Sequence, residues 1–318
     1  PDLAGHQLPV LNYHRIYDVP NDGTFTFDQG LISATTAQFR AQMVHVKQHY
    51  NPIRFSDLFA WMDHRQSLPK RPVLITFDDG HADNYTHAYP ILRELDLPAA
   101  IFLSTQYIDT GELFWFESVA NTIMEAKPGH YRLPGMKEPM VISDAESRRE
   151  MIQRVLSHIK TLDDAARVAV VKGLKTIMAP VLPSQPAMAG ALTWDQIREM
   201  GRNGIEFGSH SASHPILTKL DDSALAHELS SSIQTVRREL GTCLEVLAYP
   251  EGSASAYDAR VVEATRRAGY RLGLSYVSGT NLFRRFDAFG IRRLHIDCAM
   301  PDVQFRAMLC MPQLFSIE

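Results

Sequence analysis

Two adjacent carboxylates end an apolar run in the first third of the sequence. Asp78 and Asp79 follow residues 73–77 and precede Gly80. Two like charges this close raise the pKa of one carboxylate unless a cation or hydrogen bonds hold both ionised. A metal bound to one carboxylate, with the other left as a base, resolves this conflict. Asp-Asp-Gly is also common turn composition, so this motif on its own leaves a solvated turn open.

A pair of histidines follows another expected strand, residues 205–209. His210 and His214 are four residues apart, so a helical turn would place both imidazoles on one face. Two histidines and one carboxylate, with a position left for water, form a known catalytic metal set. A lone pair at this spacing is common on protein surfaces, but here both motifs follow expected strands. The residues together predict a metal site built from the histidines and one carboxylate.

The surrounding sequence alternates between strand and helix patterns. Buried strands are expected at 73–77, 99–103, 205–209, 246–249 and 271–275, and amphipathic helices at 85–95, 194–200, 225–240 and 261–268. Thr193 and Gln196 form a capping pattern ahead of the second helix. This alternation predicts a parallel α/β sheet, open or closed into a barrel. Sites in such folds gather at the carboxyl ends of the strands, where both motifs would lie.

One segment, from about 114 to 190, breaks the alternation. It carries helical patterns at 119–126, 145–162 and 165–178 with few strand signals. We interpret it as a helical insertion within a single domain spanning residues 1–318. Its role is either to cover the barrel structurally or, as the alternative, to form a lid that contacts the substrate.

Bulk composition excludes little. The net charge of −4 gives no reason to expect nucleic acid or an anionic membrane as a partner. No apolar stretch approaches the roughly 20 residues of a transmembrane helix. Cys243, Cys298 and Cys310 are too few for a disulfide framework, and their odd number slightly favours the cytoplasm. Because the sequence begins at Pro1 rather than Met, a removed signal peptide and a periplasmic location stay open. Oligomeric state is not indicated.

Three motifs, in order, resemble the NodB-like polysaccharide deacetylases of carbohydrate esterase family 4. They are Thr76-Phe77-Asp78-Asp79-Gly80, His210-Ser211-Ala212-Ser213-His214-Pro215 and Ala248-Tyr249-Pro250-Glu251-Gly252. The flanking stretches 11–15, 192–194 and 206–209 match as well. The resemblance is closest to the bacterial branch of exopolysaccharide and envelope-glycan enzymes. It implies an irregular (β/α) barrel of about seven strands.

The resemblance also implies roles for particular residues. Asp79, His210 and His214 would bind a divalent metal, most often zinc, with cobalt or nickel as alternatives. Asp78 would be the general base that takes a proton from the attacking water. The third motif would supply substrate binding through Tyr249, Pro250 and Glu251, with the backbone N–H at about Glu251 stabilising the oxyanion.

The third motif departs from the better-known pattern. Ala248 stands where those members carry an Arg that orients the catalytic Asp, and Glu251 stands at an aromatic position. Arg293, on a late strand-like stretch, is the candidate for the missing guanidinium, with a structural ion pair as the alternative.

Three histidines are further candidates. His295 loosely matches a late Leu-x-His motif whose histidine is the general acid. His14 ends the first expected strand and resembles a residue of this branch, with a packed histidine as the alternative. His81 is weaker, since an aromatic residue usually follows the Asp-Asp-Gly motif.

We therefore predict a metal-dependent hydrolase that removes N-acetyl groups from N-acetylhexosamine residues of an envelope glycan, exopolysaccharide or precursor. Aromatic residues suited to stacking on sugar rings are Trp115, Phe116, Tyr249 and Tyr257. The alternatives are a small amide or ureide hydrolase on the same fold, an inactive carbohydrate-binding relative, and an iron(II) oxygenase.

Overall fold

Seven parallel strands form a closed barrel in the computed structural model, which describes residues 7–20, 28–136, 138–178 and 190–316. The strands are β2 (Val10–Tyr13), β6 (Pro72–Phe77), β7 (Ala100–Leu103), β10 (Glu206–Ser209), β11 (Val246–Ala248), β12 (Leu272–Ser278) and β14 (Ile291–His295). Their order is β2-β14-β12-β11-β10-β7-β6, and β2 pairs with β6 to close the ring. The predicted irregular barrel of about seven strands is confirmed.

Strands such as β6 and β7 read as nearly continuous apolar runs because both of their faces are covered. All six residues of β6 are buried, for example. Alternate strand residues, including Val10, Leu74, Phe102 and Leu274, form one apolar cluster, which also takes in residues of α2 (Phe55–His64). Other strand residues, such as Ile75 and Ile101, belong to a second and larger cluster shared with the surrounding helices.

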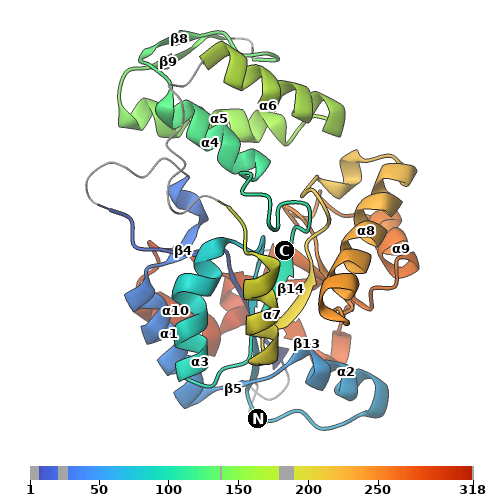
Figure 1. The fold of residues 1–318 in the computed structure, drawn as a ribbon. Helices are drawn as coiled ribbons and strands as arrows, with labels where there is room; N and C mark the ends of the chain where they lie inside the picture. Colours follow the sequence, from blue (N-terminus) through green and yellow to red (C-terminus); the bar gives the residue numbers. More distant parts are fainter. Residues whose placement is uncertain (1–6, 21–27, 137, 179–189, 317–318) are drawn as a thin grey trace.

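Helices surround the barrel in Figure 1. They are α1 (Thr36–His49), α3 (Tyr89–Glu94), α7 (Trp194–Arg202), α8 (Asp222–Leu240), α9 (Ala259–Arg267) and α10 (Asp302–Cys310). The capping pattern predicted ahead of α7 is present, because the Thr193 side chain accepts the backbone N–H of Gln196 and the Gln196 side chain accepts that of Thr193. A π-helical turn, η3 (Asn84–Ala88), precedes α3.

Helices α4 (Trp115–Glu125), α5 (Ala145–Ile159) and α6 (Asp164–Met178) form a separate layer at the top of Figure 1. They share an apolar cluster of their own, which includes Val119, Ile152 and Leu174. An antiparallel hairpin of β8 (Gly129–Tyr131) and β9 (Met140–Ile142) completes the layer. No strand pattern in the sequence predicts this hairpin, because strands of three residues are too short to show a period.

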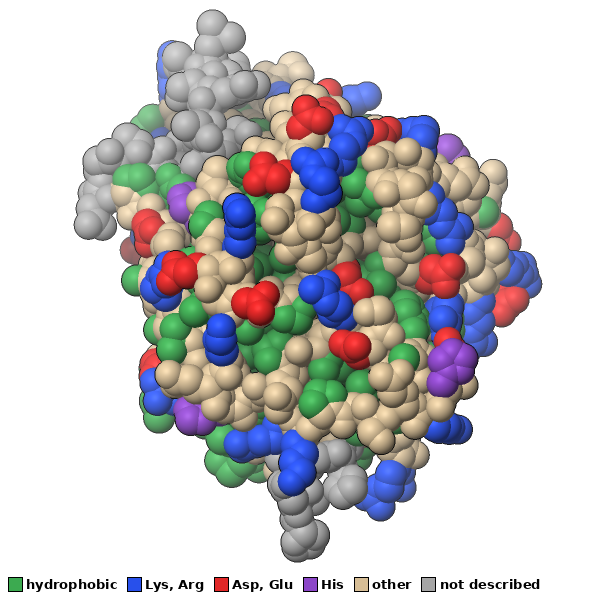
Figure 2. Space-filling model, turned by 60° about the horizontal axis from the view of Figure 1, so that its bottom comes forward, with side chains coloured by type: hydrophobic (Ala, Val, Ile, Leu, Met, Phe, Trp, Pro, Cys, Tyr) green, Lys and Arg blue, Asp and Glu red, His purple; other side chains and the backbone are tan. Residues whose placement is uncertain are grey.

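Short elements complete the fold. They are β1 (Gln7–Leu8), β3 (Arg15–Ile16), β4 (Ile32–Ala34), β5 (Asn51–Pro52), β13 (Asn281–Leu282), η2 (Gln29–Leu31), η4 (Leu217–Lys219), η5 (Phe283–Arg285) and η6 (Pro312–Phe315). None of the helices in the described ranges is long and apolar enough to cross a bilayer. On the face shown in Figure 2, acidic and basic side chains lie interspersed among apolar ones.

Candidate active site

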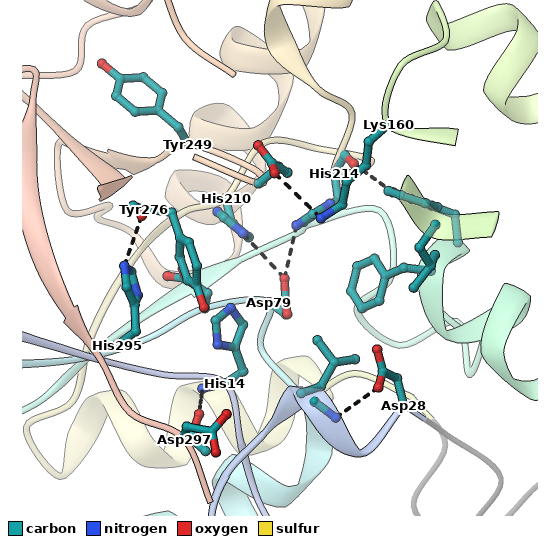
Figure 3. A pocket seen from close by; sticks show the side chains of 18 of the residues that line it. His14, Asp28, Asp79, Lys160, His210, His214, Tyr249, Tyr276, His295 and Asp297 are labelled. Atoms are coloured by element: carbon teal, nitrogen blue, oxygen red, sulfur yellow. Dashed lines mark hydrogen bonds and ion pairs between the residues drawn. The ribbon is translucent and has the colours of Figure 1, made fainter. Parts of the chain in front are cut away.

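A pocket of about 290 Å³ lies at the carboxyl ends of the barrel strands, beneath the helical layer (Figure 3). Asp78 and Asp79 reach it from the end of β6, and His210 and His214 from the loop after β10. On the other side it is lined by residues of α4 and α5: Trp115, Phe116, Gln153, Leu156 and Ser157. The inserted helices therefore form part of the pocket wall.

Asp79, His210 and His214 converge on one point. Nε2 of each histidine lies 3.4 Å from Oδ1 of Asp79, and one ligand atom from each of the three residues lies within 4.8 Å of the others. Oδ1 is buried and has no hydrogen-bond partner among the described residues. A buried carboxylate oxygen facing two imidazole nitrogens suits a divalent cation, so the donor set fits the metal that the sequence predicts.

A hydrogen bond explains why His210 presents Nε2. Nδ1 of His210 lies 2.8 Å from the carbonyl oxygen of Ala248; with Nδ1 protonated, the Nε2 lone pair is free to bind a metal. Burial, reinforced by the neighbouring His210, lowers the pKa of His214 to about 3 and favours its neutral form. Both imidazoles are therefore suited to donate a lone pair.

A loop, rather than the expected helical turn, brings the histidines together. Ser211 and His214 adopt positive φ angles of 64° and 57°. The Glu228 carboxylate of α8 accepts the backbone N–H groups of Ala212 and Ser213, each at 2.9 Å. The helical interpretation of the HxxxH spacing was wrong, because external hydrogen bonds hold a non-helical backbone here.

Asp78 is fixed in the pocket floor. Nη1 and Nη2 of Arg293 donate to its two carboxylate oxygens at 2.8 and 2.7 Å, and the Asn12 amide adds a hydrogen bond of 3.0 Å. The Arg293 Nε donates to the carbonyl oxygen of Ser275 at 2.8 Å. Burial alone would raise the pKa of Asp78, but the guanidinium charge and hydrogen bonds lower it. The carboxylate is therefore held ionised.

Tyr276, which sequence reasoning missed, lines the pocket together with Trp115 and Phe116. Its ring lies 3.6 Å, between centroids, from that of His295 and 5.9 Å from that of His14, and it is 40% exposed. His14 points into the pocket, whereas Nε2 of His295 lies 2.9 Å from the Tyr276 carbonyl oxygen (Figure 3). Burial lowers the pKa of His295 to about 3. Burial lowers the pKa of His14 as well, so the pKa does not separate these two candidates for the general acid.

The third motif, residues 248–252, faces the pocket with its backbone more than with the ring of Tyr249. The Tyr249 side chain is buried, stacks on Tyr257 and donates to the Phe289 carbonyl oxygen at 3.1 Å. The buried Tyr249 ring is therefore not free to stack on a sugar, whereas the Tyr257 ring is partly exposed and its stacking on a sugar stays a prediction. Pro250 and Glu251 form a tight turn in which Glu251 has a φ of 61°. The Glu251 carboxylate lies 3.6 Å from Lys160, just beyond α5.

The residues that sequence reasoning missed lie outside the motifs. They are Asn12, Glu117, Glu228 and Tyr276. Asn12 belongs to the quoted stretch 11–15, so its position at the end of the first strand was an available signal. The other three lie in helices or strands whose place around the pocket depends on the fold.

The model of the family described as polysaccharide deacetylase matches residues 65–273, a range that contains all three motifs. This chain belongs to the polysaccharide deacetylase family. Among curated proteins, it is similar to the poly-β-1,6-N-acetyl-D-glucosamine N-deacetylase of Staphylococcus aureus, with 31% identity over 105 residues. That match covers 31% of this chain and 36% of the relative, so it spans about a third of the relative's length. The putative polysaccharide deacetylase YxkH of Bacillus subtilis is 20% identical over 95% of this chain and 76% of its own.

Solved structures of deacetylases share the fold of this family member. The deacetylase PplD of Streptococcus pyogenes aligns with a TM-score of 0.62 and 18% identity, over 95% of this chain and 98% of its own. IcaB from Ammonifex degensii aligns with a TM-score of 0.59 and 18% identity, over 96% of this chain and 98% of its own. At these identities the likeness establishes the barrel architecture and no more.

Proposed function

We propose that this polysaccharide deacetylase is a metal-dependent hydrolase that removes N-acetyl groups from N-acetylhexosamine residues of an envelope glycan, exopolysaccharide or precursor. The observation that carries the proposal is a buried, ionised Asp78 beside the Asp79, His210 and His214 trio in one pocket. A base next to three metal donors is an arrangement that can hydrolyse an unactivated amide.

Asp79, His210 and His214 would hold the metal, zinc by preference and cobalt or nickel as alternatives. When bound, such an ion lowers the pKa of a coordinated water and polarises a carbonyl oxygen. Asp78 then accepts the proton of the attacking water, and Arg293 and Asn12 keep its carboxylate aimed at the pocket. Its low pKa keeps it ionised before the reaction, so it is ready to act as a base.

The remaining pocket residues bind and orient. Pro250 and Glu251 place a backbone N–H at the rim, where it can donate to the oxyanion that develops on the acetamide oxygen. His14 is our preferred donor to the leaving nitrogen, because its ring points into the pocket while His295 lies behind Tyr276. Tyr276, Trp115 and Phe116 offer aromatic surface to a sugar ring.

The name of the Staphylococcus relative and the aromatic walls both favour an acetylated sugar over a small amide. The test is acetate release from β-1,6- and β-1,4-linked N-acetylglucosamine oligomers, with protein stripped by a chelator and then reloaded with Zn²⁺ or Co²⁺. Metal-restored acetate release supports the proposal. Release of ammonia or amine from a panel of small amides and ureides, with no acetate from any oligomer, would move the chain to the amide-hydrolase alternative.

A further inference from the structure

A buried histidine connects the metal-binding carboxylate to the inserted helices. Nε2 of His81 lies 3.1 Å from Oδ2 of Asp79, and Nδ1 faces Oε1 of Glu117 at 3.6 Å. His81 and Glu117 are both fully buried. With both ring nitrogens protonated, the ring donates from Nε2 to Oδ2 of Asp79 and directs its Nδ1–H at the Glu117 carboxylate, which leaves Oδ1 of Asp79 facing His210 and His214.

Glu117 is itself held by a buried ion cluster. Oε1 of Glu117 lies 2.8 Å from Nη1 of Arg15, whose Nε lies 2.7 Å from Oδ2 of Asp83. The other oxygen of Asp83 accepts the backbone N–H of Ile16 at 3.0 Å. Buried ion pairs of this kind are weak contributors to stability, since desolvation offsets most of their attraction. Their rigidity next to a functional group therefore suggests that the cluster orients that group.

The first turn of α4 also contacts His214, another of the three metal-binding residues. Nε1 of Trp115 donates to the carbonyl oxygen of His214 at 2.9 Å, and the Phe116 ring lies 5.1 Å from the His214 ring in an edge contact. Trp115 and Phe116 thus contact His214 directly, and the next residue, Glu117, faces the His81 ring that contacts Asp79.

Where the chain returns from the inserted segment to the barrel, it contacts the loop that follows Asp79. The backbone N–H of Leu192 donates to the carbonyl oxygen of Gly80 at 2.8 Å, and His81 forms a β-bridge with Ala191. The segment therefore contacts the Asp79 loop both where α4 begins and where the chain returns to the barrel. The inserted segment therefore does more than cover the barrel, because it also contacts the loop that carries a metal-binding residue.

We propose that His81 and Glu117 are positioning residues for the metal site. His81 holds the Asp79 carboxylate through Oδ2, so that Oδ1 faces the two histidines. The Glu117 carboxylate in turn holds the His81 ring through Nδ1. The proposal rests on the metal site of the proposed function. A carboxylate held through one oxygen loses less rotational freedom when the other binds a cation. Partners of this kind change metal affinity by about 10- to 100-fold when removed.

The test measures Co²⁺ binding to chelator-stripped protein by isothermal titration calorimetry, together with the visible spectrum of the Co²⁺ complex. His81→Phe keeps the ring shape without nitrogen atoms, and we expect the dissociation constant to rise by about 10- to 100-fold. His81→Gln retains an N–H donor and should recover part of the affinity. Glu117→Gln should weaken binding less than His81→Phe and alter the spectrum.

The matched control is Glu125→Gln, which makes the same chemical change on the same helix. Glu125 accepts a hydrogen bond from Asn121 at 3.3 Å, and this variant should bind Co²⁺ as the parent does. Thermal unfolding establishes which variants are folded; if His81→Phe is not, His81→Gln and Glu117→Gln decide the question.

Unchanged affinity and an unchanged Co²⁺ spectrum in folded His81 and Glu117 variants would overturn the positioning role. Equal weakening by Glu125→Gln would do the same, because the effect would then belong to α4 in general. The proposed function is judged separately: a parent protein that binds Co²⁺ but releases no acetate fails as a deacetylase, with the positioning test intact. A parent that binds no Co²⁺ refutes both.

Discussion

Arg293 and Asp78 are 215 positions apart in the chain, yet they form a fully buried pair joined by two hydrogen bonds of 2.8 and 2.7 Å. Strand β14 supplies the guanidinium, while Ala248 of β11 fills the barrel interior where better-known relatives are expected to carry an Arg. An Arg on β14 can therefore orient the Asp78 carboxylate in place of an Arg on β11, because both strands end at the same pocket.

Asp78→Asn should lower kcat by about 10²- to 10⁴-fold, since the amide cannot accept a proton from water. Co²⁺ affinity should change little, because Asp79, His210 and His214 remain. Acetate release and calorimetry on the same preparation check this. Full activity in the variant would show that Asp78 is not the base.

Arg293→Lys should lower kcat and destabilise the fold. Lys keeps the charge but cannot donate two parallel hydrogen bonds to one carboxylate, so Asp78 loses its fixed orientation. Removing Arg293 altogether, as in Arg293→Met, should cost about 3–5 kcal/mol of unfolding free energy by leaving a buried charge unpaired. Urea unfolding and kcat provide the readouts. Arg292→Lys on the same strand is the control and should retain kcat.

Tyr276→Leu should raise KM for an acetylated oligomer by about 10-fold with a smaller change in kcat. Removing the ring takes away the exposed aromatic face at the pocket rim, and aromatic contacts are worth about 0.5–1.5 kcal/mol beyond the area they bury. Steady-state kinetics on the β-1,6 oligomer measures the effect. Tyr276→Phe keeps the ring and should retain the parent KM; a loss as large as that of Leu would assign the effect to the hydroxyl.

Saturating Zn²⁺ or Co²⁺ should raise the melting temperature of stripped protein. Binding to the folded state alone adds about 2.7 kcal/mol of stability at a free-metal concentration 100 times the dissociation constant. Differential scanning calorimetry measures the shift. His210→Ala should reduce it sharply. His227→Ala, in the exposed part of α8, should leave it intact.

Gly208→Ala should destabilise the barrel by about 1–3 kcal/mol. A Cβ at this position of β10 would lie 2.6 Å from the Phe102 ring and 2.9 Å from the Val246 carbonyl oxygen. Gly173→Ala makes the same change in α6, where the nearest atom would be 3.7 Å away, and should stabilise the helix. Chemical denaturation of both variants checks the opposite signs.

Local sequence pattern predicted the barrel elements well. The run 73–77 became β6, the run 99–103 became β7, and the helical stripe 225–240 lies within α8. These predictions succeed because burial on both faces and a 3.6-residue period leave direct marks on the sequence. The β8–β9 hairpin left no such mark, and the loop joining His210 to His214 takes its shape from Glu228, 14 residues beyond His214.

By itself, the sequence determined the strand and helix alternation, the family motifs and the donor types for a metal, because each depends on residues close together in the chain. Only the tertiary structure decided which guanidinium meets Asp78, that Tyr276 faces the pocket while Tyr249 packs away, and that Glu117 reaches His81. Those pairings depend on closure of the barrel through β2 and β6, on the register shift between β12 and β14, and on where the inserted helices rejoin the Asp79 loop. Contacts across such separations are set by packing of the whole fold, and no local period encodes them.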